Sequence, residues 1–177
     1  MRLLRAMAMT SAAVIALTSG PIGTVEADVT AFSDRRHDAK RTLDVERVRV
    51  DHGKRIVVTV TFRDLRRTNH AQMHVYFDTR SGDRGPEYRA EGDLGVSRSW
   101  AALRVENWQV RRAIWLAECD IDMRVSYRHD RASFDVARQC FRRPDRTRVA
   151  VYTLDWRTSQ HDYAPERHRF YDWVRQG

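Results

Sequence analysis

The 177-residue sequence has few of the residues that crosslink a chain or break its secondary structure: two cysteines, four prolines and eight glycines. It also has almost no lysine, because Lys40 and Lys54 are the only lysines among 32 basic residues. So uniform a preference for arginine indicates the codon bias of a GC-rich genome rather than selection for phosphate binding, and we expect no specific nucleic acid partner. GxSxG, SxxK, P-loop, GxGxxG and CxxC motifs are missing, so no local pattern predicts catalysis.

Long hydrophobic runs are missing too, and the longest apolar stretch, Ala6–Leu17, has 12 residues. A helix of that length spans about 18 Å of a hydrocarbon core about 30 Å thick, so we expect no stable membrane span. Arg2 and Arg5 precede the stretch, and a Gly20-Pro21 breaker and the small residues of Val25–Ala27 follow it. These are the parts of a secretory signal peptide. The sequence therefore predicts a signal peptide over residues 1–27 and a secreted, extracellular product.

The first strong β pattern follows a polar segment, residues 28–42, which we interpret as an extended lead-in. Arg55–Phe62 alternates apolar and polar residues, and a turn at Asp51–Lys54 separates it from valines at positions 45, 48 and 50. Period-two alternation that is rich in β-branched residues and split by a glycine-bearing turn is typical of a hairpin.

The same pattern recurs along the rest of the chain. Leu103–Leu116 fits a helix through two tryptophans seven residues apart, but its β-branched residues favour two short strands. Many short strands separated by turn signals indicate an all-β fold. We therefore expect a single β-sandwich domain over residues 43–177, of jelly-roll or immunoglobulin-like type. Its further predicted strands are Met73–Asp78, Ile121–Tyr127, Ala132–Val136 and Val149–Val151.

The two cysteines, Cys119 and Cys140, flank one predicted hairpin, which turns at Arg128–Arg131. Both would lie at the open end of that hairpin, within bridging reach. An even number of cysteines in an exported protein indicates a disulfide, although two free buried thiols are the alternative. The bridge would close a loop of about 20 residues and stabilise the fold by roughly 3 kcal/mol.

Three parts of the sequence resemble segments of known proteins: Leu43–His52, Val75–Arg80 with Gly85–Tyr88, and the cysteines around the hairpin. Together they resemble uncharacterised exported β-rich proteins of high-GC Gram-positive bacteria that end in an aromatic-rich Trp-Val-Arg-x-Gly tail. More distantly, the acidic lead, the hairpin and a strand ending in Asp-Thr resemble the jelly-roll domains grouped as DOMON or family 9 carbohydrate-binding modules. That second resemblance implies sugar binding with stacking aromatics and calcium. No Met or His aligns with the haem ligands of DOMON domains, so haem is not implied.

Aspartates of the acidic lead are candidate calcium ligands, because calcium takes six to eight oxygen ligands. Asp34, Asp38 and Asp44 would converge with Asp78 if the sheet brings them together. Against this, Arg35–His37 stand where a calcium loop needs a glycine-bearing turn, and arginines repel a cation. Aspartates that form turns and salt bridges are the alternative. Calcium is the one cofactor that the sequence suggests.

Two further groups of residues are candidates for binding. The five tryptophans would form a sugar-stacking platform if exposed, but we expect most of them to pack in or near the core. Five arginines crowd into 11 residues, where they would either pair with phosphates and carboxylates or form a solvated turn. These anionic-ligand candidates are Arg138, Arg142, Arg143, Arg146 and Arg148.

We expect an exported, non-enzymatic β-sandwich module that binds anionic or carbohydrate polymers at the cell surface, such as the cell wall. Loss of Arg2, Arg5 and Glu26 with the signal peptide changes the net charge from +8 to +7, which favours anions. The alternative is a secreted hydrolase whose catalytic residues are assembled across the fold. A cleft where histidines and carboxylates converge would favour the hydrolase, and exposed tryptophans or arginines would favour binding.

Overall fold

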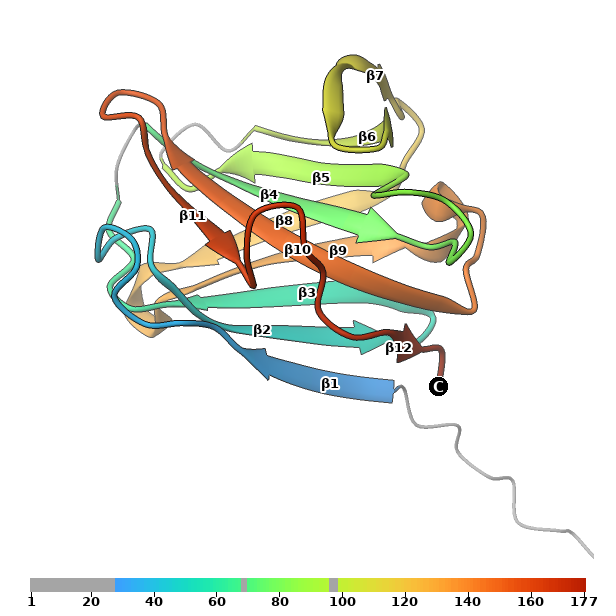
Figure 1. The fold of residues 1–177 in the computed structure, drawn as a ribbon, viewed down its shortest axis with the longest axis horizontal. Helices are drawn as coiled ribbons and strands as arrows, with labels where there is room; N and C mark the ends of the chain where they lie inside the picture. Colours follow the sequence, from blue (N-terminus) through green and yellow to red (C-terminus); the bar gives the residue numbers. More distant parts are fainter. Residues whose placement is uncertain (1–27, 68–69, 96–98) are drawn as a thin grey trace, which may run out of the picture.

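The computed structural model describes residues 28–67, 70–95 and 99–177 and shows two antiparallel β-sheets packed against each other (Figure 1). The predicted all-β sandwich is therefore confirmed. The predicted signal peptide, residues 1–27, lies outside the described residues. Within the described part of the chain, no helix has the length and apolar character needed to cross a membrane.

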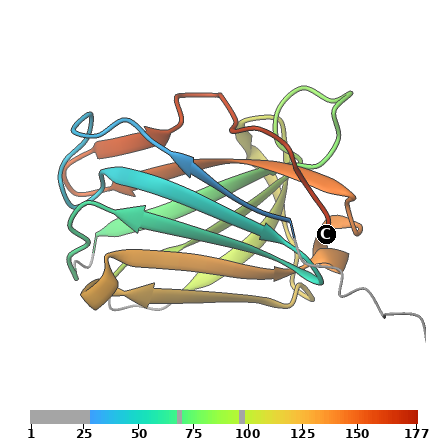
Figure 2. The ribbon, with the colours of Figure 1, turned by 90° about the horizontal axis from the view of Figure 1, so that it is seen from below.

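The five-stranded sheet has the strand order β1-β2-β3-β9-β8, and Figure 2 shows its strands side by side. The predicted hairpin forms its centre, because the alternating residues of β3 put valine, isoleucine and phenylalanine on the inner face. The strands are β1 (Asp28–Ser33), β2 (Val45–His52), β3 (Arg55–Phe62), β9 (Arg131–Ala137) and β8 (Ile121–Ser126).

The seven-stranded sheet has the order β11-β10-β4-β5-β6-β7, and β12 pairs with β10 beside this path. Leu103–Leu116 falls in two strands, β6 and β7, as the β-branched residues predicted. The strands are β4 (Ala71–Asp78), β5 (Tyr88–Asp93), β6 (Trp100–Glu106), β7 (Gln109–Trp115), β10 (Arg146–Asp155), β11 (Gln160–Ala164) and β12 (Val174–Arg175).

One hydrophobic core fills the space between the sheets. Phe62 and Phe134 reach it from the five-stranded sheet, Phe77 reaches it from the other, and all three are almost completely buried. Burial of each such side chain contributes about 1.5–3 kcal/mol. Because side chains alternate along a strand, the residues between these core positions face outward, where ligands have access.

The sandwich begins earlier than the sequence indicated. The sequence predicts a start at residue 43 after a lead-in over residues 28–42, but β1 pairs with β2 along its whole length, from Asp28 opposite His52 to Ser33 opposite Arg47. Phe32 anchors this strand by stacking on Tyr171, with ring centroids 4.7 Å apart. Because the residues that follow β1 are polar, the sequence pattern does not reveal this short strand.

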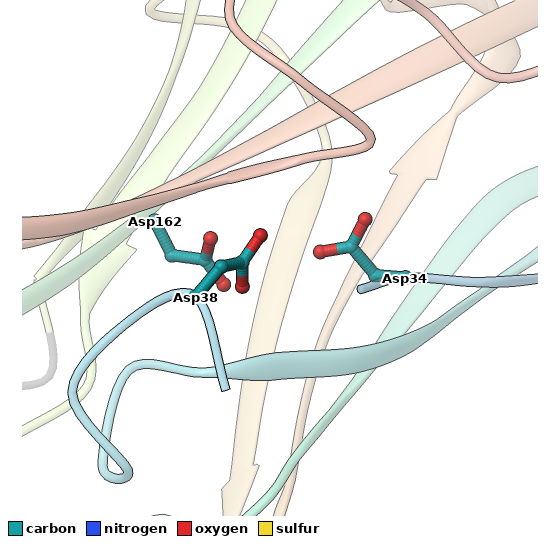
Figure 3. Close-up of side chains that lie close together, drawn as sticks. All are labelled: Asp34, Asp38 and Asp162. Atoms are coloured by element: carbon teal, nitrogen blue, oxygen red, sulfur yellow. The ribbon is translucent and has the colours of Figure 1, made fainter. Parts of the chain in front are cut away.

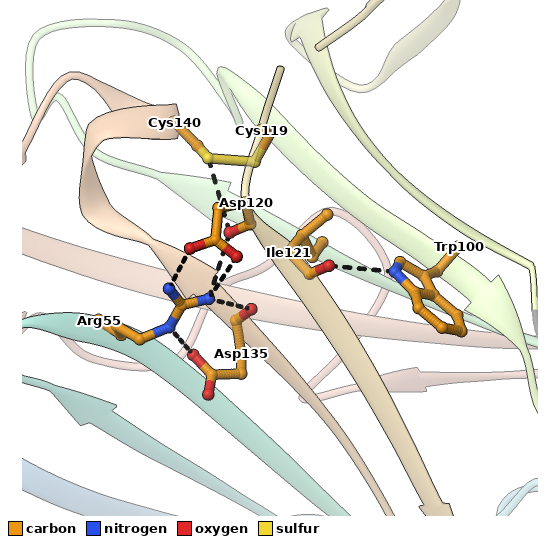
Figure 4. The surroundings of a disulfide bond; sticks show 7 residues. All are labelled: Arg55, Trp100, Cys119, Asp120, Ile121, Asp135 and Cys140. Atoms are coloured by element: carbon orange, nitrogen blue, oxygen red, sulfur yellow. Dashed lines mark hydrogen bonds and ion pairs between the residues drawn. A yellow bond between two sulfur atoms is a disulfide. The ribbon is translucent and has the colours of Figure 1, made fainter. Parts of the chain in front are cut away.

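The predicted disulfide joins Cys119 and Cys140, whose Cα atoms are 5.2 Å apart (Figure 4). The bridge closes the open end of the β8–β9 hairpin, with Cys140 in the short 3-10 helix η2 (Arg138–Phe141) that follows β9. Beside it, the Arg55 guanidinium of β3 donates to the carboxylates of Asp120 and Asp135. One arginine of β3 is thus bonded to β9 and to the residue that precedes β8 at the bridged end.

Candidate functional site

Aromatic side chains gather on the outer face of the seven-stranded sheet. Tyr76 of β4 and Tyr152 of β10 alternate with core residues and therefore point away from the core. Tyr163 of β11 lies directly opposite Tyr152 in the strand register. Trp108, in the turn between β6 and β7, contacts Tyr76 with ring centroids 5.2 Å apart. Four aromatic rings from four parts of the chain thus meet on one face.

The segment between β11 and β12 runs across this face (Figure 1). Its side chains complete a pocket of about 180 Å³, called the aromatic pocket below. Phe170 of that segment stacks on Trp108 with ring centroids 4.8 Å apart, and His168 contacts the same indole at 5.0 Å. The pocket therefore has an aromatic floor and polar groups at its rim. Its lining residues are Tyr76, Trp108, Ala150, Val151, Tyr152, Tyr163, Glu166 and His168.

The pocket offers hydrogen-bonding groups beside its apolar rings. Burial, and then the neighbouring Tyr163, raises the pKa of the Tyr152 hydroxyl, so this group keeps its proton and can donate. At the rim, Glu166 is exposed and pairs with Arg169 at 3.3 Å. Behind the floor, burial first and the Arg89 charge second lower the pKa of His74 to about 3, so this imidazole is neutral at physiological pH. The arrangement suits a neutral ligand with apolar faces and hydroxyl groups.

The position of Trp108 depends on the loop between β4 and β5. Gly85 in that loop has a φ of 80°, a backbone conformation that favours glycine. A Cβ atom at this position would collide with the Asn107 side chain and would lie 3.1 Å from Nε1 of Trp108. The absence of a side chain at Gly85 therefore lets the Trp108 turn fold back over Tyr76.

A second candidate site is a cluster of three aspartates (Figure 3). Asp34 and Asp38, both predicted calcium ligands, meet Asp162 of β11, and one ligand oxygen from each lies within 4.8 Å of the others. Burial and then the Asp162 charge raise the pKa of Asp34 to about 7, and burial, followed by the Asp38 charge, raises that of Asp162 to about 6. The Tyr171 hydroxyl lies 3.3 Å from Oδ1 of Asp34 and donates to it. Oδ2 of Asp34 is buried without a hydrogen-bond donor among the described residues.

The other two predicted calcium ligands lie outside this cluster. Asp44 is fully buried, accepts the backbone N–H of His37 and forms an ion pair with Arg63 at 3.6 Å. Asp78 is at the far end of β4, where Arg148 donates to its Oδ2 atom at 2.6 and 2.8 Å. The predicted set of four aspartates therefore does not converge, and for Asp44 and Asp78 the geometry is that of the salt-bridge alternative. Calcium at Asp34 and Asp38 stays a prediction.

Three of the five arginines of the predicted anion-binding patch have a guanidinium partner in the described part of the fold, and two do not. Arg138 donates to the carbonyl of Pro144 at 2.7 Å, and Arg146 donates to Oγ of Ser81 at 2.7 Å. Arg148, already paired with Asp78, also lies over the Trp173 ring at 4.7 Å, as Arg146 does. These three side chains therefore have structural roles.

Arg142 and Arg143 are the two exposed members of that segment, and neither guanidinium has a partner among the described residues. They follow η2 directly. Of the five predicted anionic-ligand residues, these two are the ones with guanidinium groups available to a ligand.

The expectation that most tryptophans pack in or near the core is wrong. Trp100, Trp115 and Trp156 are exposed, with 37%, 67% and 57% of their surface accessible. Trp100 still donates from Nε1 to the Ile121 carbonyl at 3.1 Å (Figure 4). Trp108 is half-buried, and it is the one that lines the aromatic pocket.

Sequence reasoning missed most residues of the aromatic pocket, although one signal was available. The strand parity that assigned Val75 and Phe77 to the core also placed Tyr76 outside, and Tyr152 has the same relation to Val151. Tyr163 was out of reach, because the short polar strand β11 has no apolar alternation. Asp162 was missed for the same reason.

Comparison with known proteins identifies no relative of this chain. No protein-family model matches the sequence, and neither the curated proteins nor the solved structures contain a match to the chain. The resemblances drawn from sequence segments therefore stay predictions, and the function has to be inferred from the geometry of this chain.

Proposed function

We propose that this protein is an exported, non-enzymatic carbohydrate-binding module that holds a sugar unit in the aromatic pocket on the outer face of the seven-stranded sheet. One observation carries the proposal. The stacked pair Tyr152–Tyr163 and the Trp108 indole border the same pocket, which is lined by Glu166 and His168 at its rim.

Sugars suit this combination of surfaces. The C–H faces of a pyranose ring pack on aromatic faces, and its hydroxyls can accept a hydrogen bond from the Tyr152 phenol and donate one to the Glu166 carboxylate. At about 180 Å³ the pocket is smaller than the 300–1,000 Å³ sites of drug-sized ligands, so it fits one unit of a chain rather than a large compound.

The test is affinity electrophoresis of the mature protein through gels that contain xylan, mannan or β-glucan. We expect at least one polysaccharide to retard the wild type. Tyr152→Ala and Trp108→Ala should weaken that retardation at least tenfold. Trp115→Ala and Trp156→Ala remove exposed tryptophans that do not line the pocket, and they should change it less than twofold.

Two results would overturn the proposal: no retardation of the wild type by any of the three polymers, or equal losses in the pocket and control variants. Reducing ends should be assayed in the same samples, because His168 and the Glu166 carboxylate share the pocket rim. Release of sugar by the wild type would favour the hydrolase alternative. Thermal melting of each variant shows whether a loss comes from unfolding.

A further inference from the structure

A pocket of about 480 Å³ lies away from the aromatic pocket, between the β6–β7 hairpin and the chain after η2. Three segments that are far apart in the sequence supply its charged groups. Arg80 and Glu87 come from the β4–β5 loop, Arg104 and Arg112 from β6 and β7, and Arg142 from the end of η2. Figure 1 shows these segments toward one end of the sandwich.

The charges in this pocket are unbalanced in favour of cations. Four arginines face two glutamates, Glu87 and Glu106. Arg80 is paired at 2.7 Å with Asp83, and Arg112 is 3.9 Å from Glu106. Arg104 and Arg142 have no ion pair or side-chain hydrogen bond among the described residues, and both side chains are exposed. Two guanidinium groups that line one pocket are thus available to a ligand.

The chain leaves η2 through two residues with left-handed backbone. Arg142 and Arg143 have φ values of 60° and 52°, in the left-handed region that glycine adopts more readily. Glycine or asparagine commonly closes a turn of this kind. This turn sets the direction of the chain after η2, and of its two arginines Arg142 is the one that lines the pocket.

Glu87 adds a feature that points to the rest of the ligand. It is 6% exposed, and its Oε2 accepts from both the N–H and the hydroxyl of Thr79, at 2.7 and 2.9 Å. Oε1 is buried and has no hydrogen-bond donor among the described residues, although Nε of Arg80 lies 3.8 Å away. A buried carboxylate oxygen without a donor is costly, so a rotation of the Glu87 side chain that brought Oε1 to the pocket surface would let a ligand hydroxyl satisfy it.

We propose that this pocket binds an acidic sugar unit, with its carboxylate or phosphate between Arg104 and Arg142 and a hydroxyl toward Glu87. Guanidinium groups pair with both kinds of acid in a bidentate way. The saccharide nature of the ligand rests on the proposed function, while the anion site rests on the arginines alone. The module would then bind a neutral unit and an acidic unit at two separate places.

The test is isothermal titration calorimetry with D-glucuronate, glucose 6-phosphate and uncharged glucose. We expect one or both acids to bind and glucose to bind at least tenfold more weakly. Raising the salt from 0.05 M to 0.5 M should weaken acid binding several-fold, because the Debye length shortens. Arg104→Gln/Arg142→Gln should weaken it at least tenfold.

The matched control is Arg111→Gln/Arg128→Gln, which removes the same charge from exposed arginines that do not line the pocket. It should change acid binding less than twofold. Equal losses in the two double variants would show attraction by overall charge, and failure of both acids to bind at 0.05 M salt would remove the site. Either result overturns the proposal.

Different results would refute the neutral-sugar site in the aromatic pocket and the acid site at the arginines. Tyr152→Ala should abolish binding of a neutral polysaccharide while leaving acid binding within twofold of wild type. If no neutral polysaccharide binds but the arginine pair proves necessary for acid binding, only the aromatic pocket is refuted.

Discussion

Tyr152 and Tyr163 lie opposite each other on β10 and β11 and stack, with ring centroids 4.7 Å apart and ring planes 30° apart. Cross-strand aromatic pairs stabilise a sheet by about 0.2–1 kcal/mol, so this pair supports the edge of the seven-stranded sheet. It also lines the aromatic pocket together with Trp108. Structural and binding roles thus fall on the same side chains, and variants must be checked for folding before binding is compared.

Gly85→Ala should disturb the aromatic pocket from outside it. The added methyl group would collide with Asn107 and crowd Trp108, and the positive φ would be strained for alanine. We expect a loss of unfolding free energy of about 1 kcal/mol or more, together with weaker polysaccharide retardation. Tryptophan fluorescence and chemical denaturation measure the two effects.

Gly82→Ala is the matched control, because a Cβ atom at that position meets nothing within 4 Å. It should leave binding and fluorescence unchanged. If Gly85→Ala had as little effect as Gly82→Ala, the close approach of Asn107 and Trp108 to Gly85 would not be what positions Trp108.

Loss of the disulfide should lower stability. Cys119 and Cys140 are 21 residues apart in sequence, and a crosslink over a loop of that size restricts the unfolded chain. Cys119→Ser/Cys140→Ser should therefore cost about 3 kcal/mol of unfolding free energy. Chemical denaturation of the oxidised wild type, the reduced wild type and the double variant would measure it. Equal stabilities for all three would contradict this role.

Stability should depend on pH through the three-aspartate cluster. The pKa values of Asp34 and Asp162 are about 7 and 6 in the folded protein, against 3.8 for a free side chain. The folded state therefore binds more protons between pH 4 and 7, so this contribution to stability is present at low pH and is lost as the pH rises. At pH 8, Asp34→Asn should be more stable than the wild type by about 1–2 kcal/mol, a value reduced for the partial exposure of Asp34.

The comparison with Asp34→Asn is needed because the lowered pKa values of His52 and His74 act in the opposite sense. At pH 5 the advantage of the variant should disappear. Asp83→Asn removes an exposed carboxylate that lies outside the cluster, and it is the control for the loss of one negative charge. A constant difference between Asp34→Asn and wild type at all pH values would refute the shift.

Added calcium separates protonation from metal binding in the same experiment. If calcium binds at Asp34 and Asp38, it should raise the melting temperature of the wild type at pH 8 and not that of Asp34→Asn. No effect on either protein would count against the calcium prediction.

Much of the fold was predictable because its signals are local. Alternation in Arg55–Phe62 identified the central hairpin, and the turn after Tyr127 placed both cysteines at one open end. The strands without such alternation escaped prediction. In β11, Gln160–Ala164, three polar residues precede one tyrosine and one alanine, so the sequence shows no alternation, and pairing with β10 is what places this strand in the sheet.

The candidate sites were less predictable because they depend on long-range contacts. Asp34 and Asp38 are near in sequence, but Asp162 joins them only because β11 pairs with β10. Arg142 and Arg148 looked equivalent in the sequence. Burial of Asp78 beside Arg148 gives that arginine a structural role, while Arg142 faces a pocket built by a distant hairpin.

The most direct test of carbohydrate binding in the aromatic pocket is an NMR titration of the five tryptophan indole N–H resonances with oligosaccharides of the polymer that retards the protein. We predict that the Trp108 resonance shifts in a saturable way while those of Trp115 and Trp156 stay in place. An unmoved Trp108 resonance alongside shifts at Trp100, Trp115 or Trp156, or no shift at any tryptophan, would contradict the assignment.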